Sequence, residues 1–86
     1  MEKLSIKAIR VNLDKTQDEM ANLLNITPRA YADRENGKSR WFFDEILTIA
    51  KFANIEIDKI KGWFYFFIRN VVENDDRNIA ANRSSK

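Results

Sequence analysis

The chain has 86 residues, which is enough for one small domain. It contains no cysteine and no histidine, so disulfide bonds, thiol chemistry and an ordinary zinc site are excluded. The formal net charge is only +2 at pH 7, and any prediction of nucleic-acid binding therefore depends on where the basic residues lie. Charges interrupt the apolar runs, and the longest run, residues 63–68, is far shorter than the ~20 residues of a membrane span. We expect a cytoplasmic protein that does not enter a membrane.

The first predicted helix covers about residues 3–13. Its apolar residues recur at the three- and four-residue spacing of a buried helical face: Leu4, Ile6, Ile9 and Leu13. Arg10 is a charge within this mostly apolar segment, and exposure to solvent is the simplest interpretation of its position.

A second helix is predicted to begin after Thr16. Thr16 and Glu19 have the spacing of a capping box, in which the hydroxyl and the carboxylate satisfy free backbone N–H groups at a helix start. The apolar face that follows consists of Met20, Ala21 and Leu24. Asn25 tolerates the left-handed conformation that ends a helix.

A third helix is predicted to follow a tight turn. Thr27 is its expected N-cap, and Pro28 occupies the first helical position, where its missing N–H has no cost. The helix should end near Glu35 or Asn36, because Gly37 is suited to the left-handed residue after a helix.

Two more helices are expected before residue 62. The fourth covers about residues 43–53, is apolar over a wide face and carries Asp44 and Glu45 in its first turn, where the helix dipole favours negative charge. Three isoleucines between residues 55 and 60 indicate a short fifth helix. The predicted fold class is therefore all-α, with five helices around one core in residues 1–62.

Residues 63–72 form an aromatic extension whose secondary structure the sequence leaves open. Phe64, Phe67 and Val71 continue a helical spacing, whereas the unbroken apolar run fits a strand equally well. We expect one side to join the core and the other to form a two-fold dimer contact; completion of the monomer core alone is the alternative. The residues assigned to the dimer contact are Trp63, Phe64, Tyr65, Phe66, Phe67 and Ile68. Residues 73–86 are polar and predict a flexible tail.

Between residues 16 and 38, a set of residue types stands at fixed offsets: Thr16, Gln17, Glu19, Met20, Ala21, Leu24, Ile26, Thr27, Tyr31, Glu35, Gly37 and Lys38. This pattern is similar to the helix-turn-helix of phage Cro proteins and repressors, and of their bacterial relatives in the xenobiotic-response-element group. The looser resemblance covers residues 4–62 and implies a compact lambda-repressor-like domain.

The resemblance implies roles for residues outside the third helix. It implies an ion pair between Arg10 and Glu35 that orients the first helix against the third, rather than adding much stability. It places Gln17 at a phosphate or a base edge. In the loop after the third helix, relatives hold the DNA backbone at the positions of Asn36, Lys38 and Arg40.

Arg34 departs from the pattern, since relatives carry an apolar or aromatic residue there. We expect its stem to pack and its charged head to reach solvent.

The third helix has a size that suits the major groove of B-DNA, which is about 12 Å wide. The side chains expected to point away from the core are Thr27, Pro28, Arg29, Ala30 and Asp33. Arg29 is the best candidate for a base contact, because a guanidinium binds guanine O6 and N7 in a bidentate way. Asp33 could accept from a cytosine amino group, but its charge repels phosphates, and an ion pair with Arg29 or Arg34 is an equal alternative.

These features predict a sequence-specific regulator that binds double-stranded DNA, a repressor of phage or bacterial type on a palindromic operator, acting as a homodimer. The alternative is a protein–protein interaction module of the antitoxin or anti-repressor type, with the aromatic extension as its main interface. Enzymatic activity is not expected, because no spacing gathers carboxylates, lysines or hydroxyls into a pocket. No cofactor, metal or small-molecule ligand is expected.

Overall fold

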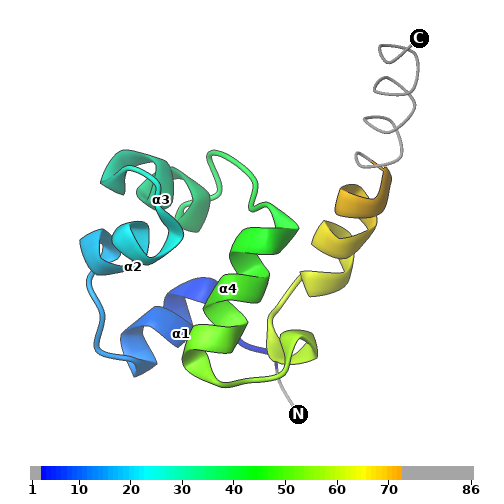
Figure 1. The fold of residues 1–86 in the computed structure, drawn as a ribbon, viewed down its shortest axis with the longest axis horizontal. Coiled ribbons are helices and arrows are strands. Elements are labelled where there is room, and N and C mark those ends of the chain that lie inside the picture. Colours follow the sequence, from blue (N-terminus) through cyan, green and yellow to red (C-terminus); the bar gives the residue numbers. More distant parts are fainter. Residues whose placement is uncertain (1–2, 73–86) are drawn as a thin grey trace, which may run out of the picture.

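The computed structural model describes residues 3–72, and this part of the chain is built from helices (Figure 1). In chain order they are α1 (Ile6–Asn12), α2 (Gln17–Leu24), α3 (Pro28–Glu35), α4 (Phe43–Ala53) and the short 3-10 helix η1 (Ile57–Lys59). A last helix over residues 63–72 is called the C-terminal helix. Within the described residues there is no β-strand, only an isolated bridge between Leu4 and Ile60. The predicted all-α, lambda-repressor-like fold is confirmed.

The core lies where α1, α2, α3 and α4 meet. The largest side chains that are less than 2% exposed come from α2, α3, α4 and the residue after η1: Met20, Tyr31, Ile46, Ile49 and Ile60. Trp41, in the loop before α4, packs edge-on against Tyr31 with ring centroids 5.5 Å apart. Removal of this apolar surface from water is the main force that holds the helices together.

Local cap signals determine where α2 and α3 begin and end. The Thr16 hydroxyl accepts from the Glu19 backbone N–H at 3.1 Å, and the Glu19 carboxylate accepts from the Thr16 N–H at 2.8 Å, so the predicted capping box is present. Asn25 ends α2 with φ 58°, in the left-handed region. Thr27 caps α3 through its hydroxyl, and Gly37 follows α3 with φ 82°. The helix-turn-helix boundaries are therefore those that the sequence predicts.

α1 begins at Ile6, later than the predicted start near residue 3. Ser5 caps the helix through its hydroxyl. Leu4 is paired instead with the chain near η1, since its N–H donates to the Lys59 carbonyl and its carbonyl accepts from the Lys61 N–H, both at 2.8 Å. Ile60, which follows η1, is extended, and the predicted fifth helix is limited to the three residues of η1.

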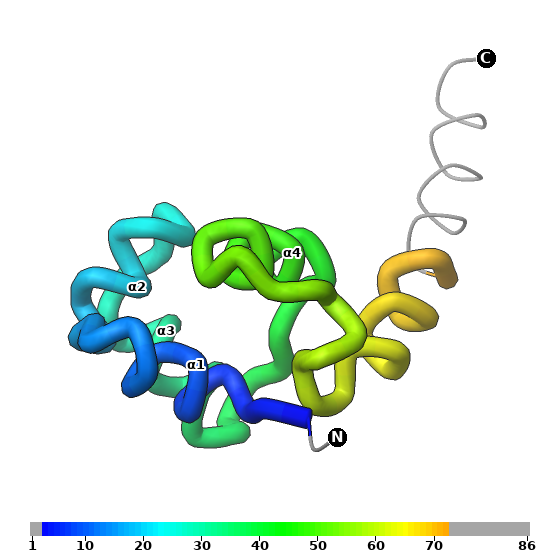
Figure 2. The backbone as a smooth tube through the Cα atoms, turned by 90° about the horizontal axis from the view of Figure 1, so that it is seen from below, coloured from blue at the N-terminus to red at the C-terminus, as the bar shows by residue number. Residues whose placement is uncertain are grey.

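The C-terminal helix resolves the choice between helix and strand that the sequence left open. Gly62, with φ 81°, separates it from η1. Trp63 and Phe66 pack against the core, as expected for one side of the segment. The other large apolar side chains are exposed: Phe64, Tyr65, Phe67, Ile68, Val71 and Val72. Figures 1 and 2 both show this helix at the opposite end of the molecule from α2.

Residues 73–86, for which a flexible tail was predicted, lie outside the described residues. Across residues 3–72, no helix combines the length and the apolar character that a membrane crossing requires.

Candidate nucleic-acid interface

The Glu35 carboxylate joins three helices at the inner side of α3. Arg10 of α1 donates to it through Nε at 2.9 Å and Nη2 at 3.2 Å, which is the ion pair expected from the sequence. Gln17 of α2 donates through Nε2 at 2.9 Å, and the Tyr31 hydroxyl donates at 2.9 Å. Arg10 also donates to the Lys15 carbonyl at 2.9 Å. The side chain of Glu35 is only 2% exposed, so this cluster links α1, α2 and α3 away from solvent.

The electrostatics of this cluster keep the carboxylate ionised. Burial raises the pKa of Glu35, but hydrogen bonds from Arg10, Gln17 and Tyr31, together with the charge of Arg10, outweigh this effect and leave the pKa below its usual value. Burial, and then the bond to Glu35, raise the pKa of the Tyr31 hydroxyl, which therefore stays protonated as a donor. Near neutral pH the cluster therefore joins a charged carboxylate to donors from α1, α2 and α3.

The outer side of α3 carries the side chains predicted to face DNA. Thr27, Pro28 and Arg29 are exposed, and Ala30 and Asp33 are partly exposed. Arg29 Nε lies 3.6 Å from Asp33 Oδ1, while the Arg29 side chain is 85% exposed. An ion pair of Asp33 with Arg29 or with Arg34 was considered from the sequence, and the structure shows the pair with Arg29. This contact is long and solvated, so it restrains Arg29 only weakly.

Gln17 is hydrogen-bonded to α3 and still reaches the protein surface. It is partly exposed and one of its two amide N–H groups is used by Glu35. Its position at the first residue of α2 places it beside backbone N–H groups that have no partner within the helix.

The loop between α3 and α4 carries Asn36, Lys38 and Arg40, all exposed. The backbone N–H of Lys38 donates to the Asp33 carbonyl at 2.8 Å, which folds the loop back against the end of α3. The loop after α3 thus presents two exposed basic residues, Lys38 and Arg40.

Arg34 does not present its charged head to solvent, and this prediction was wrong. Its Nε lies 2.8 Å from Glu45 Oε1, its Nη1 donates to the Ala30 carbonyl at 3.2 Å, and its side chain is 13% exposed. The first turn of α4 supplies a carboxylate close enough to pair with it, so that pairing replaces hydration. Arg34 thus ties α3 to α4 instead of contributing charge to the surface.

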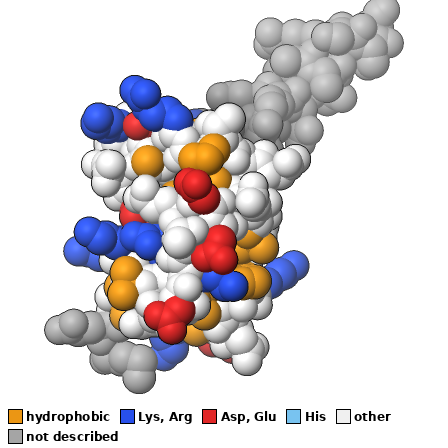
Figure 3. Space-filling model, turned by 90° about the vertical axis from the view of Figure 1, so that its left-hand side faces the viewer, with side chains coloured by type: hydrophobic (Ala, Val, Ile, Leu, Met, Phe, Trp, Pro, Cys, Tyr) orange, Lys and Arg blue, Asp and Glu red, His pale blue; other side chains and the backbone are white. Residues whose placement is uncertain are grey.

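Charges of both signs occupy the face that carries α2 and α3. Figure 3 shows basic side chains at the top of this face and on both of its sides, with acidic side chains between them. The basic groups of this face are therefore interspersed with carboxylates.

The helices α2 and α3 are joined at Asn25, which has the left-handed conformation. The second helix, α3, is capped, is exposed on its outer side and is followed by basic residues. These features define a helix-turn-helix DNA-binding domain. A family model described as helix-turn-helix matches residues 6–60. The chain belongs to this family, which is of the Cro/C1 type, and is a DNA-binding regulator. Comparison with curated proteins and with solved structures gave no match.

Proposed function

We propose that the protein is a sequence-specific transcriptional repressor of phage or bacterial type, acting in the cytoplasm, whose α3 lies in the major groove of a palindromic operator. The observation that carries this proposal is the two-sided character of α3. Thr27, Pro28 and Arg29 are exposed at its capped start, while Tyr31 and the Glu35 side chain are buried on the other side. A helix held rigidly from behind, with exposed side chains near its N-terminus, suits contact with base edges.

Arg29 is the principal base contact in this proposal. Its long, solvated contact with Asp33 has little energetic value, so the guanidinium can turn toward guanine at small cost. Asp33 then becomes available to accept from a cytosine amino group. Thr27 accepts a backbone N–H with its hydroxyl oxygen and can still donate its proton to a phosphate or place its methyl group against thymine. Pro28 offers no donor and contributes by shape.

The contacts around α3 position the protein on the DNA backbone. Gln17 has a second amide N–H that can reach a phosphate or a base edge, and its orientation is set by Glu35. Asn36, Lys38 and Arg40 are exposed in the loop after α3 and are assigned to phosphates. Such contacts give affinity that falls with salt but carry no sequence information.

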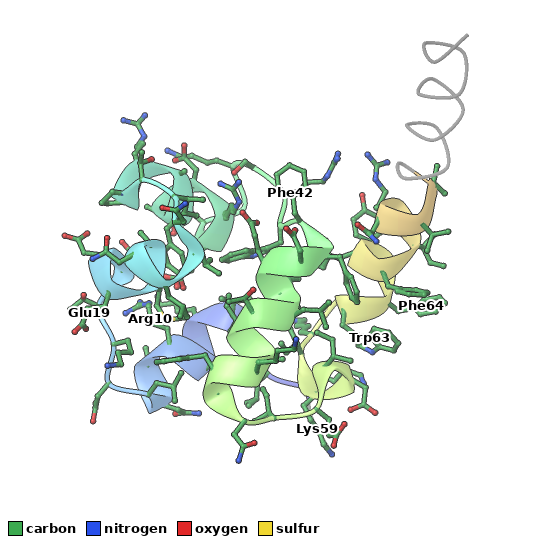
Figure 4. All side chains as sticks on the ribbon, viewed as in Figure 1. Arg10, Glu19, Phe42, Lys59, Trp63 and Phe64 are labelled. Atoms are coloured by element: carbon green, nitrogen blue, oxygen red, sulfur yellow. The ribbon has the colours of Figure 1, made fainter. Side chains whose placement is uncertain are left out.

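The exposed face of the C-terminal helix supports a homodimer. Phe64, Phe67, Ile68 and Val71 stand at the i, i+3, i+4 and i+7 positions of one helical face, and they are 57%, 37%, 42% and 40% exposed. Figure 4 shows Phe64 directed away from the rest of the molecule. An apolar face of this extent is a feature of interaction sites. Trp63 and Phe66 pack on the chain's own core and would contribute less to the contact than the sequence suggests.

A two-fold dimer would present two copies of α3 to one side of a duplex. The operator would then consist of two inverted half-sites about one helical turn apart. Repression would follow from occupation of that operator.

A protein–protein module of the antitoxin or anti-repressor type is the second candidate. The same exposed aromatic face favours it, as does the acidic Asp33 on the outer side of α3. In that case the C-terminal helix would bind a different chain.

A gel-shift experiment with mixed bacterial genomic fragments separates these candidates. The repressor proposal predicts that a small subset of fragments shifts in the presence of excess bulk competitor DNA. Failure of any fragment to shift, or an equal shift of all of them, would leave the protein–protein module as the better proposal. Sedimentation of the free chain tests the dimer separately, and a monomer at concentrations on the order of tens of micromolar would reject it.

A further inference from the structure

Phe42 is a large aromatic residue at a position where neither burial nor helix capping accounts for it. It is the N-cap residue of α4, a position at which Ser, Thr, Asp or Asn normally supplies a side-chain acceptor. Its ring cannot do so, and it is 46% exposed. Figure 4 shows Phe42 where the loop from α3 reaches α4.

The ring of Phe42 is in contact with two guanidinium groups. The central carbon of Arg34 lies 5.5 Å from the ring centroid, and that of Arg40 lies 5.6 Å from it. Both distances are within the range in which an aromatic ring attracts a cation. The two arginines differ in exposure. The side chain of Arg34, which is paired with Glu45, is 13% exposed, and Arg40 is an exposed residue.

Glu45 fixes this arrangement from the α4 side. Its Oε1 accepts from Arg34 Nε at 2.8 Å and from the Phe42 backbone N–H at 3.0 Å. One carboxylate thus holds the backbone of Phe42 and one of the two cations over its ring. The ring therefore stands at the end of the loop with its backbone held by Glu45, and the exposed Arg40 lies over it.

A long side chain that is ordered before binding loses less entropy when it meets its partner. Arg40 is an exposed residue of the loop that follows α3, two positions after Lys38. Restriction of its rotamers by the ring would favour contact with a phosphate placed beside α3. The ring itself need not touch DNA for this effect.

We propose that Phe42 is a positioning residue that holds the Arg40 guanidinium ready for a phosphate of the DNA backbone. This inference rests on the assignment of Arg40 as a backbone contact in the proposed function. Phe42 acts through Arg40, and Arg34 and Glu45 act through Phe42.

The test is a double-mutant cycle on the full chain, with the affinity for a short labelled duplex of arbitrary sequence measured at several salt concentrations. Phe42→Leu is expected to weaken binding roughly two- to fivefold, the effect of losing one exposed cation–aromatic contact. Phe42→Tyr keeps the ring and should bind as the wild type does. Arg40→Ala should reduce the slope of log affinity against log salt by about 0.9, the value for one phosphate. In the Arg40→Ala background, Phe42→Leu should cause no further loss.

Phe52→Leu is the matched control. Phe52 lies at the other end of α4, is 45% exposed, and has the Lys15 ammonium 5.9 Å from its ring centroid. It shares the exposure and the type of contact of Phe42 but not the neighbourhood of α3. Its replacement should leave DNA affinity unchanged.

Three results would overturn the proposal. An equal loss from Phe42→Leu with and without Arg40 would mean that the ring contacts DNA directly. No loss from Phe42→Leu, while Arg40→Ala weakens binding, would refute the positioning role and leave the proposed backbone contact intact. An unchanged affinity and salt slope in Arg40→Ala would refute both. Thermal unfolding by circular dichroism sets a temperature at which every variant is folded, so that each affinity is measured on folded protein.

Discussion

Replacement of Glu35 by glutamine isolates the contact that fixes α3. The carboxylate accepts hydrogen bonds from three side chains and is 2% exposed. A glutamine amide would turn an N–H group toward donors and would leave Arg10 without its counter-charge. Loss of one partner from a buried ion pair costs about 3–5 kcal/mol. Because Arg10 is 15% exposed and keeps its bond to the Lys15 carbonyl, we expect the lower end, about 3 kcal/mol.

Urea unfolding followed by tryptophan fluorescence measures this loss, since Trp41 is buried against Tyr31 in the same core. The control is the double variant Arg10→Met, Glu35→Gln, which removes both charges and keeps an amide oxygen as acceptor for Gln17 and Tyr31. It should be more stable than Glu35→Gln alone, because no unpaired charge remains in the interior. An unfolding free energy of Glu35→Gln within about 0.5 kcal/mol of the wild-type value, as is typical of a surface substitution, would contradict the role given to the cluster. A Glu35→Gln variant that is no less stable than the double variant would contradict it as well.

Three further predictions concern pH, DNA and assembly. The pKa of Glu35 is lower in the folded state than its ordinary value of 4.5, so the stability that the ionised carboxylate contributes is present at higher pH and is lost as pH falls through the folded pKa. The difference in unfolding free energy between the wild type and Glu35→Gln should therefore shrink in acid. A constant difference in urea titrations at each pH would count against this prediction. Arg29→Ala should lose about 1–3 kcal/mol of discrimination between bases. Lys38→Ala should weaken binding to all duplexes alike and lower the slope of log affinity against log salt by about 0.9. Competition binding with matched and mismatched duplexes measures both effects, and an equal loss of specificity in the two variants would disprove these roles. Light scattering should show a dimer for the wild type and a monomer for Phe64→Asp. The control is Val11→Asp, since Val11 is also exposed but lies on α1, and this variant should remain dimeric. A dimer in both variants would exclude the C-terminal helix as the interface.

The helix-turn-helix was predictable because its signals are local. Thr16 and Glu19 are three residues apart, Thr27 directly precedes Pro28, and Asn25 ends its own helix. Each of these acts within one helical turn, so the sequence carries the information without knowledge of the fold. Family resemblance then supplied the Arg10–Glu35 pair, whose members are 25 residues apart.

The features that sequence analysis missed depend on distant contacts. Arg34 was expected in solvent, but α4 brings Glu45 to it. The start of α1 moves because Leu4 pairs with the chain near η1. The apolar run at residues 63–68 fits two periodicities, and only the packing of Trp63 and Phe66 on the core distinguishes them. Phe42 gave one signal that could have been noticed, an aromatic residue at an N-cap position between basic and acidic residues.

In the proposed function, the outer face of α3 contacts bases in the major groove. Selection of bound duplexes from a random pool, carried out in parallel with the wild type and with Arg29→Ala, tests it most directly. The account predicts that the wild type enriches an inverted repeat with half-sites about one helical turn apart, and that Arg29→Ala loses the preference for guanine at one position in each half-site. Enrichment of the same sequences by both proteins, or of none by either, would contradict the account.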